Sequence, residues 1–358
     1  MKIVRLSTFL DFGGIETKMV NLSEYEDLNN DWVFVAINKG GIAEKKIRAN
    51  NKRVVCLNLP YKIPSLKTLI ELFKFFRKEK PDVIHTSGAE ANFFGYLAGR
   101  LAGVSNIIVE EIGIPNHSSK AKKIFQYIFN NANWAIGESK VVVNHITLNY
   151  KLNPLRTKVI HNFGVFNYDF SAISNQALMG DAFKIVTISR LEPVKNIETL
   201  IRVISLLIKE NIKVELTIAG SGILEDSLKQ LVVELHLQDI VTFVGFITDP
   251  YPYLQNSDLY ILNSFTEGFS NSLVEAMYSK TLSLSTNVGA APEIIIDSKN
   301  GFITPVDDEK ALYEKIKNII RMSREQRQAI ELAGNQTVIE NFSLHGHISE
   351  LIKIYNKN

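Results

Sequence analysis

Two glutamates, Glu267 and Glu275, stand eight positions apart in the stretch SFTEGFSNSLVEAM. Small and polar residues lie between them, and an apolar helical pattern follows. Ser270 or Asn271 can cap a helix that begins near Ser272, because short polar side chains accept hydrogen bonds from the free N–H groups of a first turn. Glu275 then lies about one turn inside the helix, while Glu267 stays in the loop. The alternative is that both are ordinary surface acids.

Two cations stand in another predicted loop, within Ser189-Arg190-Leu-Glu-Pro-Val-Lys195-Asn196. This segment joins a predicted strand to a helix that Asn196 can cap. A helix N-terminus with Arg190 and Lys195 beside it is a good site for a diphosphate, because free N–H groups and cations both attract phosphate oxygens. Two solvated loop cations would also fit the pattern.

Glycines follow three more predicted strands, namely Gly220 with Gly222, Gly245 before Phe246, and Gly13 with Gly14. The first pair lacks a third glycine and is a weak signal for dinucleotide binding, but such loops let the backbone approach a ligand closely. Free N–H groups at Phe269 to Leu273 would also face the ligand. Together the loops fit a ligand with a central anion and hydroxyls at both ends, and a nucleotide sugar is such a ligand.

The composition bounds the kind of protein that positions these loops. A chain of 358 residues predicts two domains, and 46% apolar with 22% charged residues is ordinary for a globular protein. Cys56 is the only cysteine, which excludes an intrachain disulfide and fits a reducing compartment. The N-terminus reads as a strand rather than a signal peptide, and no apolar run approaches about 20 residues. We expect a cytoplasmic protein.

The two halves of the chain differ in charge. Residues 1–175 hold 23 Lys and Arg against 15 Asp and Glu, and residues 176–358 hold 17 against 23. The basic half could meet an anionic membrane surface, a nucleic acid or its own acidic partner domain. A basic and then aromatic stretch at residues 118–129 could likewise touch a membrane or a lipid-linked acceptor, although a core helix with a solvated first turn explains it equally well.

Short apolar strands alternate with longer helical patterns along both halves, which predicts an α/β fold with two doubly wound domains. One predicted helix, over 66–77, carries Leu66, Leu69, Ile70 and Phe73 on one face. Periodicity is lost around 166–181, the predicted linker. Ligands of such folds bind at the carboxyl ends of the strands, so in a two-domain protein we expect them in the cleft between the domains.

Four motifs in order carry a resemblance to a known family. They are the N-terminal Gly13-Gly14, the Arg190–Lys195 pair, Val-x-Phe-x-Gly245, and Glu267-Gly-Phe-x3-Leu-Val-Glu275-Ala-Met. Together they look like the family-4 retaining glycosyltransferases of GT-B fold, also called glycosyl transferases group 1. The match runs from Lys2 to the helix that contains Tyr355. It implies two Rossmann-like domains that face each other across a cleft, with the acceptor-side domain at 1–170, the nucleotide-sugar-binding domain at 171–340, and a C-terminal helix at 341–358 that packs back on the first domain.

The resemblance also implies roles for single residues. Arg190 and Lys195 would neutralise the departing diphosphate, and Glu267 would hold hydroxyls of the donor sugar at the reacting end. Glu275 would accept hydrogen bonds from the ribose. The remaining donor-binding positions would be Gly13, Gly14, Gly220, Gly245, Phe246, Gly268, Phe269, Ser270, Asn271 and Leu273.

The acceptor side departs from the family pattern. Family members often carry a histidine after the fifth strand, where this chain reads Ile-Val-Glu110-Glu111-Ile-Gly113-Ile-Pro-Asn-His117. Glu111 stands about where that histidine is expected and His117 follows, so both are candidates for the acceptor side. A second departure is Gly289-Ala290 where the family usually has two glycines.

The resemblance therefore implies a retaining glycosyltransferase, an enzyme of EC class 2.4 that needs neither a metal nor a cofactor. Its expected partners are a UDP- or GDP-linked sugar donor and a glycan or lipid-linked acceptor, with possible peripheral contact with an anionic membrane and no nucleic acid. Bacterial cell-surface polysaccharide biosynthesis, of capsule, O-antigen or exopolysaccharide, is the expected setting. The alternatives are a sugar-nucleotide epimerase of the same architecture and a catalytically silent nucleotide-sugar-binding protein.

Overall fold

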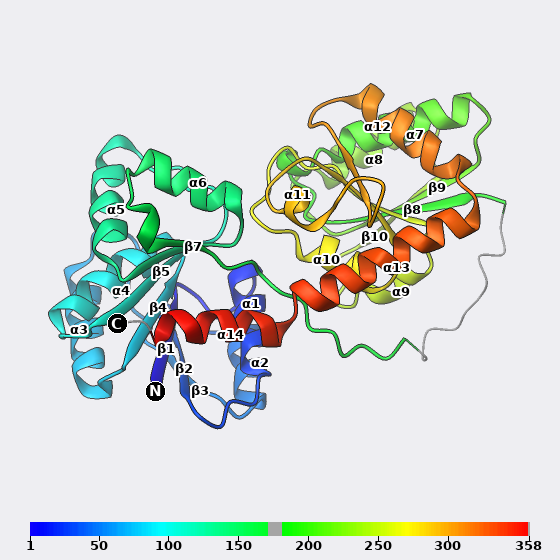
Figure 1. Cartoon of the computed structure of the whole chain (residues 1–358). Helices are drawn as coiled ribbons and strands as arrows, with labels where there is room; N and C mark the ends of the chain where they lie inside the picture. The colour runs from blue at the N-terminus through cyan, green and yellow to red at the C-terminus, as the bar shows by residue number, and fades with distance from the viewer. Residues whose placement is uncertain (171–180, 357–358) are drawn as a thin grey trace. The chain divides into compact units, whose positions relative to one another are not determined.

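The structure, a computed structural model, describes residues 1–170 and 181–356 and divides the chain into two compact units (Figure 1). Unit 1 comprises Met1–Asn162 and Leu344–Asn358, and unit 2 comprises Phe163–Ser343. The chain therefore changes unit between Asn162 and Phe163 and again between Ser343 and Leu344, whereas the bounds given above for the domains were 170 and 340. Most of the predicted linker, residues 171–180, lies outside the described residues.

Unit 1 contains, among its described residues, a seven-stranded parallel sheet in the order β3-β2-β1-β4-β5-β6-β7. Its strands are β1 (Lys2–Ser7), β2 (Asp31–Ala36), β3 (Arg53–Cys56), β4 (Val83–Ser87), β5 (Asn106–Glu111), β6 (Trp134–Gly137) and β7 (Thr157–Val159). Its helices are α1 (Gly14–Ser23), α2 (Ile42–Ala49), α3 (Leu66–Glu79), α4 (Ala89–Leu101), α5 (Ser119–Asn131), α6 (Lys140–Asn149) and α14 (Leu344–Tyr355), with a 3-10 turn η1 (Pro154–Arg156). Strands β4 and β5 are buried along their whole length, as parallel strands are when helices cover both faces.

Helix α14 is bound into unit 1 by polar contacts with three strands of the sheet, β4, β5 and β7. The Tyr355 hydroxyl lies 2.6 Å from Nδ1 of His85 in β4. Asn106, the first residue of β5, donates its side-chain N–H to the Tyr355 carbonyl at 2.7 Å. Lys158 of β7 and Glu350 form an ion pair at 2.6 Å. The last helix is therefore an integral part of the first unit.

Helix α3 packs through a different face from the predicted one. Leu66 is 71% exposed and Ile70 is 42% exposed, so these two residues of the predicted apolar stripe face outward. Leu72 and Phe76 are fully buried instead. The predicted apolar stripe and the buried one share Leu69 and Phe73, which are partly buried. Because the two stripes overlap, helical spacing alone could not show which of them packs against the sheet.

Unit 2 contains a six-stranded parallel sheet, among described residues, in the order β10-β9-β8-β11-β12-β13. Its strands are β8 (Phe183–Ile188), β9 (Val214–Ala219), β10 (Val241–Gly245), β11 (Leu259–Leu262), β12 (Leu282–Thr286) and β13 (Phe302–Thr304). Its helices are α7 (Ile197–Lys209), α8 (Glu225–Glu234), α9 (Tyr251–Gln255), α10 (Asn271–Tyr278), α11 (Ala291–Ile294), α12 (Glu309–Arg321) and α13 (Arg324–Asn341), with a 3-10 turn η3 (Pro193–Lys195).

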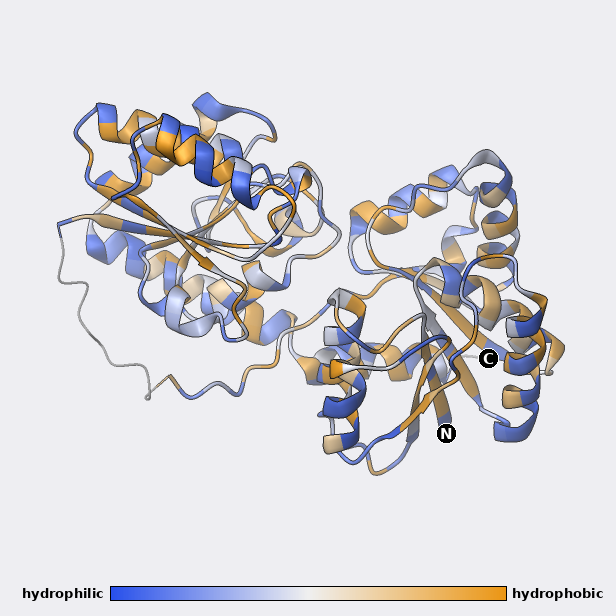
Figure 2. Cartoon of the chain, turned by 180° about the vertical axis from the view of Figure 1, so that it is seen from behind, coloured by the Kyte–Doolittle hydropathy of each residue, from blue (hydrophilic) through white to orange (hydrophobic). Residues whose placement is uncertain are grey.

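Each unit has an apolar interior around its sheet. In Figure 2 the strands are mostly orange, and the helices that cover them show a blue outer side. One apolar cluster of unit 2 joins the sheet to α7, α8 and α12, and a second one joins it to α9, α10, α11 and α13. The predicted doubly wound α/β architecture is therefore confirmed in both units. Within residues 1–170 and 181–356, no helix is both long and apolar enough to cross a membrane.

Candidate active site

Two loops of unit 2 meet at the carboxyl ends of β8 and β11, which are neighbours in the sheet. The backbone N–H of Phe265, after β11, donates to the carbonyl of Val194, in the 3-10 turn after β8, at 2.8 Å. Asn263 donates its side-chain N–H to the carbonyl of Asn196 at 3.0 Å. These two bonds fix the loop that carries Lys195 against the loop that carries Glu267.

Lys195 and Glu267 form an ion pair across this junction, between Nζ and Oε1. Ser264 donates its hydroxyl to the same Oε1 at 2.6 Å. The Lys195 side chain is 15% exposed and that of Glu267 is 12% exposed, so both reach the surface only in part. The structure thus brings together two predicted site residues that are 72 positions apart, and both donors that the described residues supply to Glu267 bind Oε1.

Arg190 does not take part in this pair. Its guanidinium binds Glu192 at 2.7 Å in the same loop, and its side chain is 69% exposed. Asn196 occupies the N-cap position of α7 without a side-chain bond to the helix backbone, and accepts the Thr199 hydroxyl at 2.8 Å instead. The N–H groups of the first turn of α7 are therefore not capped by this side chain.

Helix α10 begins at Asn271, and Ser270 is its cap, since its hydroxyl accepts the N–H of Leu273 at 3.3 Å. The side chains of Phe269 and Leu273 are buried in the core, so these two residues can offer a ligand only backbone groups. The N–H of Leu273 is already bonded, whereas the sequence pattern suggested it for ligand binding.

Gly289 closes the other side of the Glu267 loop. Its φ is 52°, and a Cβ there would lie 2.5 Å from the carbonyl oxygen of Glu267. Ala290 donates its N–H to the carbonyl of Gly268 at 3.0 Å. The glycine is required here because only a residue without a side chain lets these two backbone segments approach so closely.

Glu275 lies in the second turn of α10, and its carboxylate has no hydrogen-bond or ion-pair partner among residues 1–170 and 181–356. Burial raises the pKa of this carboxyl to about 7, and the negative charge of Asp249 adds to the effect. Asp249 accepts the Tyr168 hydroxyl at 2.8 Å. Sequence reasoning missed Asp249, although it stands in the loop after Gly245 and Phe246 at a strand end. Among the described residues, the Glu275 carboxylate therefore has the like charge of Asp249 acting on it and no hydrogen-bond donor.

The predicted glycines of unit 2 differ in their surroundings. A Cβ at Gly220 would lie 1.8 Å from the carbonyl oxygen of Ser189, so this glycine lets two strand-end loops pack together. A Cβ at Gly245 would meet no atom within 4 Å. Phe246, which follows, is 57% exposed. The backbone is therefore open at Gly245 and closely packed at Gly220.

The other four predicted residues lie in unit 1. Gly13 is the N-cap of α1 and Gly14 its first residue; a Cβ at Gly14 would meet nothing within 4 Å. Glu111 is the last residue of β5 and is buried. His117 stacks on Phe125 with ring centroids 3.9 Å apart, and its Nδ1 lies 2.7 Å from the Tyr150 hydroxyl.

A buried ion cluster that the sequence did not reveal stands next to Glu111. The Glu110 carboxylate forms ion pairs with Lys18, between Oε1 and Nζ at 2.6 Å, and with Arg5, between Oε2 and a guanidinium nitrogen at 3.2 Å. All three side chains are buried. Burial alone would raise the pKa of Glu110, but Lys18 and the His85 hydrogen bond hold it well below its usual value. Burial, with the Arg5 charge, lowers the pKa of His85 to about 3. Because Lys18 belongs to α1, the cluster fixes the helix that begins at Gly14.

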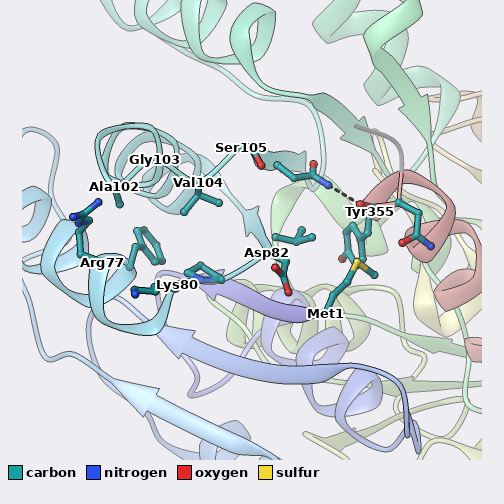
Figure 3. Close-up of a pocket in the computed structure, with 14 residues that line it drawn as sticks. Met1, Arg77, Lys80, Asp82, Ala102, Gly103, Val104, Ser105 and Tyr355 are labelled. Carbon is teal, nitrogen blue, oxygen red and sulfur yellow. Dashed lines mark hydrogen bonds between the residues drawn. The ribbon is translucent and has the colours of Figure 1, made fainter.

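A pocket of about 750 Å³ lies in unit 1 and has neither Glu111 nor His117 in its lining (Figure 3). Its lining includes Arg77, Lys80, Asp82, Ser105 and Tyr355. It stands where β4 and β5 begin, whereas ligands of α/β folds bind where strands end. In the described parts of the chain, no group of three or more His, Cys, Asp or Glu side chains could hold a metal ion.

Comparison with known sequences matches both units. The family model for "Glycosyl transferases group 1" matches residues 170–337, and that for "Glycosyltransferase Family 4" matches residues 12–163. A capsular polysaccharide biosynthesis glycosyltransferase of Staphylococcus aureus is 25% identical over 307 residues, which is 81% of this chain and 80% of that protein. The UDP-Gal:alpha-D-GlcNAc-diphosphoundecaprenol alpha-1,3-galactosyltransferase of Escherichia coli is 25% identical over 317 residues, with the same two coverages.

Comparison with solved structures matches the whole chain. The crystal structure of Anabaena Alr3699/HepE in complex with UDP superposes with a TM-score of 0.86 at 21% identity, over 99% of each chain. At this level of identity the likeness concerns the fold, and it covers both parallel-sheet units.

Proposed function

Because the chain belongs to the family-4 glycosyltransferases of GT-B fold, we propose that it transfers a sugar from a nucleoside-diphosphate donor with retention of configuration. The observation that carries this proposal is the junction of Lys195, Glu267 and the start of α10 in unit 2. It offers a cation, a carboxylate and a helix N-terminus at the carboxyl edge of one sheet. A sugar diphosphate needs these three groups, since its phosphates are anionic and its sugar carries hydroxyls.

Each group has a distinct task in this proposal. Lys195 neutralises charge on the departing diphosphate, and Arg190 assists it after leaving Glu192; such preorganised contacts stabilise developing charge. Glu267 accepts sugar hydroxyls through Oε2 while Lys195 and Ser264 hold Oε1. Glu275 accepts the ribose hydroxyls. The exposed segment at Gly245 and Phe246 meets the base through its backbone. In unit 1, the Gly13-Gly14 turn is open to a ligand, since a Cβ at Gly14 would meet no atom within 4 Å.

The chemistry of the partners follows the two curated relatives. One of them is named for a UDP-linked donor and an acceptor on diphosphoundecaprenol, and the other for capsular polysaccharide biosynthesis. We therefore propose a UDP- or GDP-linked donor and a glycan or lipid-linked acceptor in cell-surface polysaccharide biosynthesis. No metal step is required by this arrangement, because Lys195, Arg190 and a helix N-terminus neutralise the phosphates.

A transfer assay tests the proposal. The protein is incubated with a panel of UDP- and GDP-sugars and with undecaprenyl-diphosphate-linked GlcNAc, with and without a strong chelator. We expect nucleoside diphosphate and an anomerically retained product, both unaffected by the chelator. Loss of transfer that returns with magnesium or manganese would contradict the metal-free part. Conversion of the donor sugar at C2 without an acceptor would indicate an epimerase, and thermal stabilisation by a donor without turnover would indicate a binding protein.

We further propose that helix α5 touches an anionic membrane. Lys120, Lys123, Ile124 and Tyr127 are exposed and follow each other at helical spacing, so cations and apolar side chains share one face. Sedimentation with vesicles that contain anionic lipid tests this. The double variant Lys120→Glu, Lys123→Glu should stay in the supernatant, and equal binding of wild type and variant would contradict the proposal.

A further inference from the structure

Four titratable side chains gather at the carboxyl edge of the sheet in unit 1, each from a different element. Glu111 ends β5, Glu90 stands in the first turn of α4, His117 lies in the loop before α5, and Tyr150 follows α6. The negative charge of Glu90 acts on both Glu111 and His117, and that of Glu111 acts on Tyr150. The four groups therefore form one electrostatic cluster.

The Glu111 side chain accepts a single hydrogen bond from the described residues, and its donor lies outside the four-residue cluster. Asn92 of α4 donates its side-chain N–H to Oε1 at 2.9 Å. Asn92 is itself fixed, because its Oδ1 accepts the Thr86 hydroxyl at 2.6 Å and its N–H also reaches the Glu110 carbonyl at 3.0 Å. The second oxygen, Oε2, accepts no hydrogen bond from residues 1–170 or 181–356. A buried carboxylate normally needs a cation or several donors, and Glu111 has neither.

The charges around Glu111 are negative. Lys18 and Arg5 are both bound to Glu110, whose side chain points to the opposite face of β5 because neighbouring strand residues alternate. Burial raises the pKa of Glu111 to about 8; the Asn92 hydrogen bond acts to lower this pKa, and the charges of Glu110 and Glu90 act to raise it. The Tyr150 hydroxyl and the half-buried His117 ring, the other titratable groups of the cluster, bring no positive charge, because burial lowers the pKa of His117.

We propose that Glu111 acts as a neutral carboxylic acid that donates a hydrogen bond from its O–H to a sugar hydroxyl of the acceptor, while the Glu90 carboxylate accepts a hydrogen bond from a neighbouring hydroxyl. Sugar hydroxyls donate and accept at once, so an acid beside a carboxylate matches two of them. Glu90 is partly exposed, and its Oε2 has the Thr8 hydroxyl at a weak 3.4 Å. This subsite rests on the proposed glycosyl transfer. It excludes Glu111 as the base that deprotonates the acceptor, because a neutral acid cannot take the proton.

The protonation state is tested first, on the ligand-free protein, by infrared difference spectroscopy of wild type against Glu111→Gln. We expect the carbonyl band of a protonated acid at neutral pH, lost with a midpoint near pH 8. In Glu90→Gln the midpoint should move to lower pH, since a like charge has been removed. Glu71→Gln, at a partly exposed position of α3, is the matched control and should leave the band unchanged. A carboxylate signal at neutral pH would overturn the proposal.

The subsite is tested next by kcat/KM for the acceptor probe, undecaprenyl-diphosphate-linked GlcNAc, across the same pH range. Wild type should lose activity as Glu111 ionises. Glu111→Gln keeps an N–H donor, so it should stay within about fivefold of wild type at neutral pH and lose the alkaline decline. Glu111→Ala should fall by a further factor of about ten. A folded but inactive Glu111→Gln that still binds UDP would show that the carboxylate is needed, and would overturn the proposal.

The two proposals fail in different ways. If wild type transfers no sugar from any donor of the panel, the proposed function fails and the sugar ligand of Glu111 fails with it. The infrared result on the ligand-free protein still decides whether Glu111 is neutral. If transfer occurs and the band is absent, only the inference about Glu111 is wrong.

Discussion

Glu275 offers the sharpest test of the donor site, through the pH dependence of UDP binding. Its pKa is about 7 in the ligand-free protein, so the carboxyl is about half ionised at neutral pH, about a tenth ionised one unit below and about nine-tenths ionised one unit above. If ribose hydroxyls bind only the carboxylate, the apparent affinity follows the ionised fraction. The ratio of wild-type to Glu275→Gln affinity should therefore rise about tenfold over these two units.

Calorimetry of UDP with both proteins measures this ratio. The phosphate of UDP titrates in the same range, but it affects both proteins alike and cancels in the ratio. Above the pKa, Glu275→Gln should bind UDP more weakly by about 1.5–3 kcal/mol, the usual worth of hydrogen bonds to a charged group. Wild type should also release about half a proton on binding at neutral pH, which the mutant should not. A ratio that is constant across the range would mean that Glu275 does not meet the nucleotide.

The same shift has a consequence for stability that needs no ligand. A carboxyl whose pKa is raised on folding favours the folded state only while it is protonated, so the wild type loses stability as pH rises from about 4.5 to about 7. A rise of the pKa from 4.5 to about 7 corresponds to at most about 3.4 kcal/mol, and to less here because the Glu275 side chain is partly exposed. Glu275→Gln should therefore melt at a higher temperature than wild type above neutral pH and at the same temperature in acid. The reverse order would contradict the raised pKa.

Two further substitutions test which residues bind the diphosphate and which bind the sugar of the donor. Lys195→Ala removes the cation that faces Glu267. It should lower turnover by about 100-fold with a smaller loss of donor binding, because leaving-group charge grows toward the transition state. Lys213→Ala, which breaks an exposed ion pair with Asp181, is the control, and unchanged turnover in Lys195→Ala would mean that this lysine has only a structural role. Glu267→Gln changes only the contact with the sugar of the donor, so calorimetry should find UDP bound about as tightly as by wild type, while sugar transfer falls sharply. A larger loss of UDP binding than in Glu275→Gln would mean that the donor binds in the opposite orientation.

The sequence by itself determined the fold and the family. Strand–helix alternation repeats along both halves, and each segment must bury its apolar residues wherever it lies, so periodicity alone predicted the two doubly wound sheets. The cap of α10 could also be predicted from the sequence, because the Ser270 hydroxyl accepts a hydrogen bond from a residue only three positions away. The packing face of α3 was not, because the neighbour that covers a helix is chosen by the order of the strands.

Only the tertiary structure decided which side chains act on one another. Lys195 meets Glu267 because β8 and β11 are neighbours in the sheet, and strand order cannot be read from spacing along the chain. The raised pKa values of Glu275 and Glu111 depend on burial and on Asp249 and Glu90, which come from other elements. Electrostatic effects depend on distance and solvent exposure in three dimensions, and a linear pattern records neither of them.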